Sequence, residues 1–143
     1  MKRTITAFTC IGAAAGIIAV VSACSAAPSA KVPTGTDLKG TWVQAGDGYE
    51  RGMRVTPENQ MAMATVVIVE ADGQAFTGYK EHTDPGERPQ KETINGVVGR
   101  DGDILITDED GYLTGQLVDG KISGQYAEIG NDAAAINMEL SRQ

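Results

Sequence analysis

The chain has few of the residue types on which metal clusters, disulfide frameworks and nucleophilic catalysis usually depend. Its 143 residues include two cysteines, one histidine and one tryptophan, and aromatic residues make up only 5%. A structural zinc site needs four Cys or His ligands, and a disulfide scaffold needs several cysteine pairs. The composition therefore excludes both, and we expect no metal and no cofactor.

Basic residues are also scarce. The chain has 12 Lys and Arg against 19 Asp and Glu. The first 23 residues contain two of the basic residues, so the remainder has 12 − 2 = 10 basic residues and a net charge of 10 − 19 = −9. Nucleic-acid binding needs a basic surface, so we expect no nucleic-acid partner. Five prolines, 18 glycines and 41% hydrophobic residues suit a small globular β domain better than a disordered chain.

The N-terminus has the pattern of a secretory signal peptide. Met1-Lys2-Arg3 is positively charged, and residues 5–21 are almost wholly apolar. A retained membrane helix is the alternative, but Val21-Ser22-Ala23-Cys24 resembles the lipobox of bacterial lipoproteins. The resemblance implies a helical signal peptide over 1–23, addition of a diacylglycerol to the Cys24 thiol, and cleavage before Cys24. It also implies acylation of the new amine, for instance with palmitate. The protein would then be anchored by lipid to a membrane of the bacterial cell envelope, on the extracytoplasmic side.

Two further segments follow from composition. Residues 24–37 contain the lipidated Cys24 and a stretch rich in Ala, Ser, Pro and Thr, which predicts a flexible tether. Residues 38–143 make up the folded domain. No secreted enzyme is expected from it, because no serine has the Gly-x-Ser-x-Gly surroundings of a nucleophile elbow.

Short apolar or alternating runs, separated by turn signals such as Asp-Gly, fill the domain. They predict eight strands, at 38–45, 62–70, 74–82, 92–99, 103–107, 112–118, 121–129 and 134–141. Consecutive tight hairpins favour an all-β, antiparallel, up-and-down barrel, because closure removes exposed strand edges. A sandwich is the main alternative.

Four strands repeat an apolar residue, a small polar residue and a glycine. The glycines are Gly78, Gly96, Gly115 and Gly124. Glycine inside a strand marks a bend or a close approach. We favour sharp coiling of the barrel at one level, and the alternative is space for a ligand.

Gly40-Thr41-Trp42 on the first predicted strand resembles the Gly-x-Trp mark of the calycin barrels, which include lipocalins and avidins. In those families a basic residue of the last strand lies across this tryptophan, and Arg142 has the matching place. The resemblance implies a cation–π contact that closes the barrel at Trp42. Phe76-Thr77-Gly78 followed by Tyr79 is similar to the avidins' third strand. Avidins hold biotin with several tryptophans, so a single tryptophan argues against biotin.

The longest predicted connection, residues 46–60, is the candidate ligand site. In lipocalins the first loop forms a lid over the barrel mouth. Tyr49 and Met53 would cover an apolar ligand, and Arg51 and Arg54 would meet its acidic group. The alternatives are a flexible loop whose arginines offset nearby acids, or a loop of which part extends a strand.

Two other features have simple structural explanations. His82 ends the predicted strand at 74–82, next to a loop, and is expected to be a surface histidine rather than a catalytic one. An acidic patch around one hairpin is expected to serve turn formation, although a weak calcium site is an alternative that lacks EF-hand spacing. The patch consists of Asp101, Asp103, Asp108, Glu109 and Asp110.

Two functions remain open. The barrel binds a small apolar or amphipathic ligand, or it is a filled module that binds or inhibits another envelope protein. The second applies if the interior is filled by Phe76, Ile94, Val97, Ile104, Leu113, Ile122, Ile136 and Met138. The strand at 61–69 is apolar on both faces, which favours a homo-oligomer interface or cover by the tether or first loop.

Overall fold

The computed structural model describes residues 31–59, 64–83, 86 and 88–143. The predicted signal helix and Cys24 lie outside the described residues. Within the described part, the only helix is one 3-10 turn, η1 (Thr36–Leu38), and no helix is long and apolar enough to cross a membrane. The strands are β1 (Gly40–Glu50), β2 (Met53–Val55), β3 (Ala64–Asp72), β4 (Ala75–His82), β5 (Gln90–Val98), β6 (Asp103–Thr107), β7 (Gly111–Val118), β8 (Lys121–Glu128) and β9 (Ala134–Arg142).

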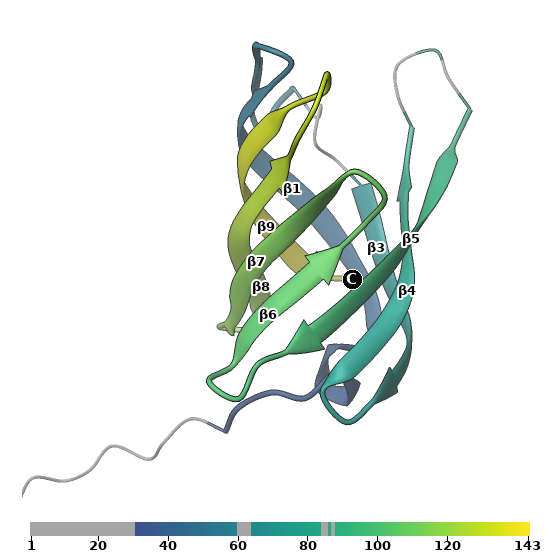
Figure 1. Ribbon diagram of the computed structural model, residues 1–143, viewed down its shortest axis with the longest axis vertical. Coiled ribbons are helices and arrows are strands. Elements are labelled where there is room, and N and C mark those ends of the chain that lie inside the picture. Colours follow the sequence, from purple (N-terminus) through teal and green to yellow (C-terminus); the bar gives the residue numbers. More distant parts are fainter. Residues whose placement is uncertain (1–30, 60–63, 84–85, 87) are drawn as a thin grey trace, which may run out of the picture. The chain divides into compact units, whose positions relative to one another are not determined.

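The strands form a closed antiparallel barrel (Figure 1). From β3 to β9 each strand pairs with the next along the chain, and β1 pairs with both β3 and β9. The β1–β9 pairing runs from Trp42 opposite Arg142 to Glu50 opposite Ala134, so the sheet closes on itself. β2 adds a short partner to the last residues of β1. The predicted all-β, eight-stranded, up-and-down barrel is confirmed, and the sandwich is excluded.

Because the strands alternate in direction, the turns gather at two opposite ends of the barrel (Figure 1). We call one the closed end: it contains η1 and the turns that join β3 to β4, β5 to β6 and β7 to β8. We call the other the polar end: it contains the turns that join β1 to β2, β6 to β7 and β8 to β9. The chain enters at the closed end, where the Gly35 amide donates a hydrogen bond to the Gly73 carbonyl, 3.0 Å away.

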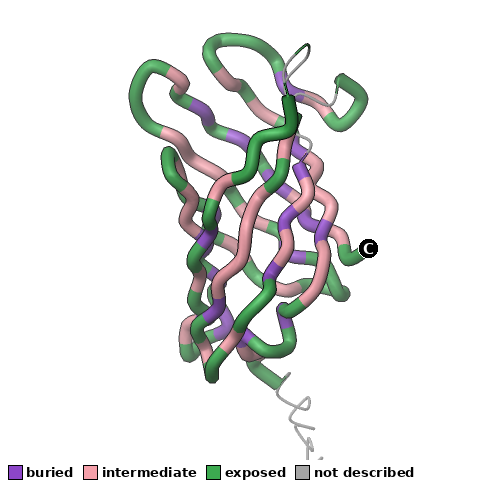
Figure 2. The backbone as a smooth tube through the Cα atoms, turned by 90° about the vertical axis from the view of Figure 1, so that its right-hand side faces the viewer, coloured by how far each residue is buried: buried purple, intermediate pink, exposed green. Residues whose placement is uncertain are grey.

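Buried and exposed residues alternate along the strands, as expected when one sheet face lines an interior (Figure 2). The buried core consists of Leu38, Trp42, Val55, Val66, Ile68, Phe76, Ile94, Val98, Ile104, Ile106, Leu113, Ile122, Ala134, Ile136, Met138 and Leu140. Seven of the eight residues expected to fill the interior belong to it. Val97 does not: it is 43% exposed, because its neighbour Val98 faces inward and successive strand residues face opposite ways.

The repeated glycines lie where neighbouring strands come close together. A Cβ atom added to Gly124 would lie 2.7 Å from the Gly115 Cα on the paired strand β7. One added to Gly96 would collide with the Phe76 ring. These close approaches of neighbouring strands favour sharp coiling of the barrel at the level of the glycines over space left there for a ligand.

The structure corrects two predicted boundaries. β1 continues to Glu50, and Arg51 and Gly52, with φ of 49° and 76°, make a tight turn into β2. Most of the connection predicted at 46–60 is therefore a hairpin rather than a lid. The last residues of the predicted tether are also folded, because Gly35 is buried and η1 follows it.

Candidate functional site

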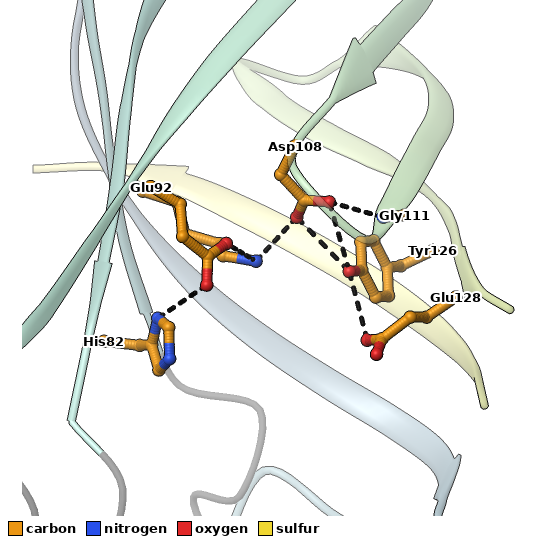
Figure 3. A network of polar contacts seen from close by, with 7 residues as sticks. His82, Glu92, Asp108, Gly111, Tyr126 and Glu128 are labelled. Carbon is orange, nitrogen blue, oxygen red and sulfur yellow. Dashed lines mark hydrogen bonds and ion pairs between the residues drawn. The ribbon is translucent and has the colours of Figure 1, made fainter. Parts of the chain in front are cut away.

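The polar end holds a cluster of inward-facing charged and hydrogen-bonding side chains. We call it the polar cluster, and its members are Lys80, His82, Glu92, Asp108, Tyr126 and Glu128 (Figure 3). They alternate in phase with core residues: Lys80 follows Gly78 by two positions, Glu92 precedes Ile94, and Asp108 follows Ile106. Strand pairing brings them together, since Lys80 lies directly opposite Glu92.

Lys80 is the centre of the polar cluster. Its Nζ lies 2.6 Å from Asp108 Oδ2 and 2.8 Å from Glu92 Oε2. The three side chains are 17%, 5% and 18% exposed, respectively. Burial alone would lower the pKa of Lys80, but hydrogen bonds and charges from Asp108 and Glu92 outweigh it and raise that pKa. Lys80 therefore stays protonated and acts as a fixed charge rather than as an amine nucleophile.

Asp108 links two elements of the polar end. It lies in the β6–β7 turn and accepts a hydrogen bond from the Gly111 amide at 2.7 Å. Burial would raise the pKa of Asp108, but the hydrogen bond and charge of Lys80, with the Gly111 and Tyr126 hydrogen bonds, lower it overall. Asp108 is therefore ionised and firmly held.

Tyr126 lies between two carboxylates. Its hydroxyl is 3.2 Å from Asp108 Oδ2 and 3.4 Å from Glu128 Oε2. Burial, followed by the charges of Asp108 and Glu128, raises the pKa of Tyr126, so the phenol keeps its proton. One hydroxyl has one proton to donate, so it satisfies one of the two carboxylates at a time.

Glu128 is the least compensated carboxylate of the polar cluster. Burial and then the charge of Asp110 raise the pKa of Glu128, and Glu50 and Asp132 add to the effect. The Tyr126 hydrogen bond opposes this rise. A group that brings a hydrogen-bond donor or a positive charge to Glu128 would be bound favourably.

His82 is the last residue of β4, which matches the end of the strand predicted at 74–82. Its side chain is only 21% exposed, so the expectation of a histidine on the surface is wrong. Its Nδ1 lies 3.7 Å from Glu92 Oε1, beyond hydrogen-bond distance. Among the described residues, this buried nitrogen has no hydrogen-bond partner. Figure 3 shows the His82 ring beside Glu92, on the opposite side of the polar cluster from Glu128.

The residues predicted to bind a ligand do not meet on the inner face. Tyr49 pairs across strands with Arg54 and with the exposed Ala135, which places Tyr49 and Arg54 on the outer face. Arg54 forms an ion pair with Asp47 at 2.8 Å, and Arg51 forms one with Asp132 at 2.8 Å. The arginines thus offset nearby acids, the alternative considered from the sequence.

Met53 shares the inner side of the hairpin with the buried Val55, but it is 49% exposed at the rim. The predicted ligand site at residues 46–60 does not form, because Gly46 and Gly48 belong to β1 rather than to a turn.

At the closed end, Arg142 lies over the Trp42 ring, with its guanidinium carbon 4.4 Å from the ring centroid. Arg142 also donates hydrogen bonds to the carbonyls of Lys39 and Asp37, at 2.6 and 2.7 Å. The Trp42 indole N–H donates to the Leu38 carbonyl at 2.9 Å. These contacts tie η1 across this end of the barrel.

The predicted acidic patch does not form one group. Asp103 begins β6 at the closed end, and Asp108 follows β6 at the polar end. Where the chain is described, no three His, Cys, Asp or Glu side chains are placed to hold a metal ion together.

Sequence reasoning missed the polar cluster, although a signal for it was present. Lys80 and Glu92 continue the inward alternation of Phe76, Gly78 and Ile94, so they occupy interior positions with charged side chains. Neither a protein-family model nor a curated protein matches the sequence.

Proposed function

We propose that this protein is a bacterial envelope lipoprotein whose barrel binds a small amphipathic ligand at its polar end. The observation that carries the proposal is the polar cluster, which places charged groups on the inner face of the barrel. Charged residues are rarely directed into a protein interior unless they are paired or serve binding. Packed core residues around Trp42 and Phe76 occupy the other half of the interior, so the proposed ligand is assigned to the polar half.

The chemistry of the polar cluster narrows the ligand. Tyr126 has one proton for Asp108 and Glu128, so a hydrogen-bond donor from a ligand would satisfy the second carboxylate. Met53, which is 49% exposed on the inner side of the rim, would contact an apolar portion of the ligand. The ligand is therefore a small molecule that joins an amine, hydroxyl or amide to an apolar group.

Two features support a calycin-like barrel and a lipid-anchored location. The Gly-x-Trp motif, with Arg142 across Trp42 and η1 closing the barrel, is similar to the calycin and avidin pattern. Val21-Ser22-Ala23-Cys24 supports lipid anchoring at Cys24. No enzymatic activity is part of this proposal.

Native mass spectrometry of the full chain, extracted in mild detergent from its own host, tests the ligand. Asp108→Asn is the test variant, and Asp103→Asn at the opposite end of β6 is the matched control. We expect wild type and Asp103→Asn to retain a small molecule that Asp108→Asn loses. Equal retention in all three proteins, or none in wild type, would contradict a site at the polar cluster.

Replacing Cys24 tests whether the protein is anchored to a membrane by lipid. Cys24→Ser should abolish palmitate labelling and release the protein from membranes. Cys10→Ser, within the predicted signal peptide, should change neither. Unchanged labelling and fractionation of Cys24→Ser would exclude a lipoprotein.

A filled barrel that binds or inhibits another envelope protein is the second candidate function. It is favoured by two grooves, of about 660 and 550 Å3, lined mainly by outer-face residues. The smaller groove includes the exposed Val97 and Leu105. Val97→Asp should abolish co-purification of such a partner, whereas Asp108→Asn should leave it unchanged.

A further inference from the structure

The chain joins the barrel at the closed end through several contacts. Gly35 donates to the carbonyl of Gly73, in the β3–β4 turn. Val32 and Pro33 lie beside Gly102, in the β5–β6 turn. Both turns belong to the closed end, so residues 32–35 lie at the end of the barrel away from the polar cluster.

We infer that the closed end of the barrel faces the lipid surface and that the polar end faces the aqueous phase. The ligand of the polar cluster is then a solute taken from water rather than a molecule taken from the bilayer. This inference rests on the proposed function, since it takes Cys24 as the anchor.

The short chain between Cys24 and the barrel limits which end of the barrel can reach the membrane. Cys24 and Lys31 are 31 − 24 = 7 residues apart. Seven residues span at most about 25 Å when fully extended, and about 15 Å on average as a flexible chain. β1 has 11 residues. At the usual rise and tilt of barrel strands, such a strand makes the barrel wall about 28 Å tall. To bring the polar end to the membrane, the chain would have to run fully stretched along the whole wall.

Charge acts in the same direction. At the polar end, the exposed carboxylates of Glu109 and Asp110 lie in the β6–β7 turn, next to Gly111, which pairs in register with Glu128. Anionic headgroups repel such a surface. Turning the polar end toward the membrane would therefore cost electrostatic energy as well as chain stretching.

Energy transfer from two single-cysteine variants to vesicle surfaces tests the orientation. Val118→Cys lies next to the β7–β8 turn at the closed end, and Ile129→Cys follows β8 at the polar end. Both positions are exposed, at 51% and 83%. The mature lipoprotein would have no other free thiol, because Cys10 leaves with the signal peptide and Cys24 is acylated. Each full-length variant is labelled with a donor dye and reconstituted into vesicles of phosphatidylethanolamine and phosphatidylglycerol whose headgroups hold an acceptor.

We expect transfer from position 118 to exceed transfer from position 129 several-fold. A ten-residue Gly-Ser insertion between Ala30 and Lys31 should reduce the difference, because the longer chain lets the barrel turn. Equal transfer from both positions, or stronger transfer from 129, would overturn the orientation. Failure of the wild-type protein to float with vesicles would instead overturn the proposed anchor, so the two failures are distinguishable.

Discussion

The closed end and the polar end belong to the same strands, yet their inner faces differ in chemistry. At the closed end, Leu38, Trp42 and Ile122 are 0% exposed and pack in an apolar core. At the polar end, the same inward alternation presents Lys80 and Asp108. Apolar burial stabilises the fold directly, whereas buried charges contribute little net stability and are costly when unpaired. The closed end therefore contributes most to the stability of the barrel, and the polar cluster is the part of the interior assigned to the proposed ligand.

Removing the centre of the closed end should have the largest effect. Trp42→Ala should lower the free energy of unfolding by roughly 3–5 kcal/mol, because it leaves a cavity and removes the partner of Arg142. Urea denaturation measures the loss. The outer-face control Val97→Ala should change stability by less than about 0.5 kcal/mol. A loss similar to that of the control would show that Trp42 does not close the barrel.

Breaking the ion pairs of the polar end should have the second-largest effect on the free energy of unfolding. Lys80→Met should cost about 3 kcal/mol, because Glu92 and Asp108 remain without their cation. The triple variant Lys80→Met, Glu92→Gln, Asp108→Asn should recover most of this loss. Lys121→Met removes the 2.8 Å outer pair with Glu139, where the side chains are 50% and 47% exposed, and should cost less than about 1 kcal/mol. Equal losses for Lys80→Met and Lys121→Met would contradict a special role for the inner pairs.

The pH dependence of unfolding reports on the charges of the polar end. The pKa of Asp108 is lowered in the folded protein, so its contribution is complete above the unfolded value of about 3.9 and is lost as the pH falls through the folded value. The pKa of Lys80 is raised, so its contribution is complete below about 10.4 and is lost as the pH rises through the folded value. Thermal melting across both pH ranges should show a shallower acid decline for Asp108→Asn than for wild type. Unchanged acid sensitivity in Asp108→Asn would exclude this carboxylate as its source.

The smallest expected effect has the opposite sign. The pKa of Glu128 is raised, first by burial and then by Asp110, so the folded state disfavours its charge. Glu128→Gln should therefore stabilise the protein at pH 7, by less than about 1 kcal/mol because solvent screens this partly exposed group. The difference should disappear at a pH low enough to protonate Glu128. Destabilisation by Glu128→Gln at pH 7 would show that its charge has a partner that the present contacts do not include.

Much of the fold could be predicted from local patterns. Asp119 and Gly120 have φ of 51° and 80°, as a tight hairpin requires, and they join β7 to β8 at the predicted position. The extent of β1 was missed because Gly46-Asp47-Gly48 has the composition of a turn. In the structure, Gly48 continues the strand because it pairs with Ile136 of β9. β9 approaches so closely there that an added Cβ would collide with the Ala135 carbonyl.

The candidate site was less accessible to sequence reasoning. Arg51 and Arg54 were predicted to bind the acidic group of a ligand because they lie in a long predicted connection. In the structure they form ion pairs with Asp132 and Asp47. Lys80 and Asp108 are 28 positions apart, and no local pattern relates them. They became neighbours only when the strands were paired in register.

The sequence by itself determined the strand pattern, because alternation and turn residues act within a few positions of the chain. The prediction of a lipid anchor at Cys24 also rests on the sequence alone, because the lipobox-like motif is contiguous. Only the tertiary structure decided that Lys80, Asp108 and Tyr126 share one interior, since barrel closure joins β4, the β6–β7 turn and β8 around a common axis. The separation of an apolar closed end from a polar end arises in the same way, because it depends on the register of every strand at once.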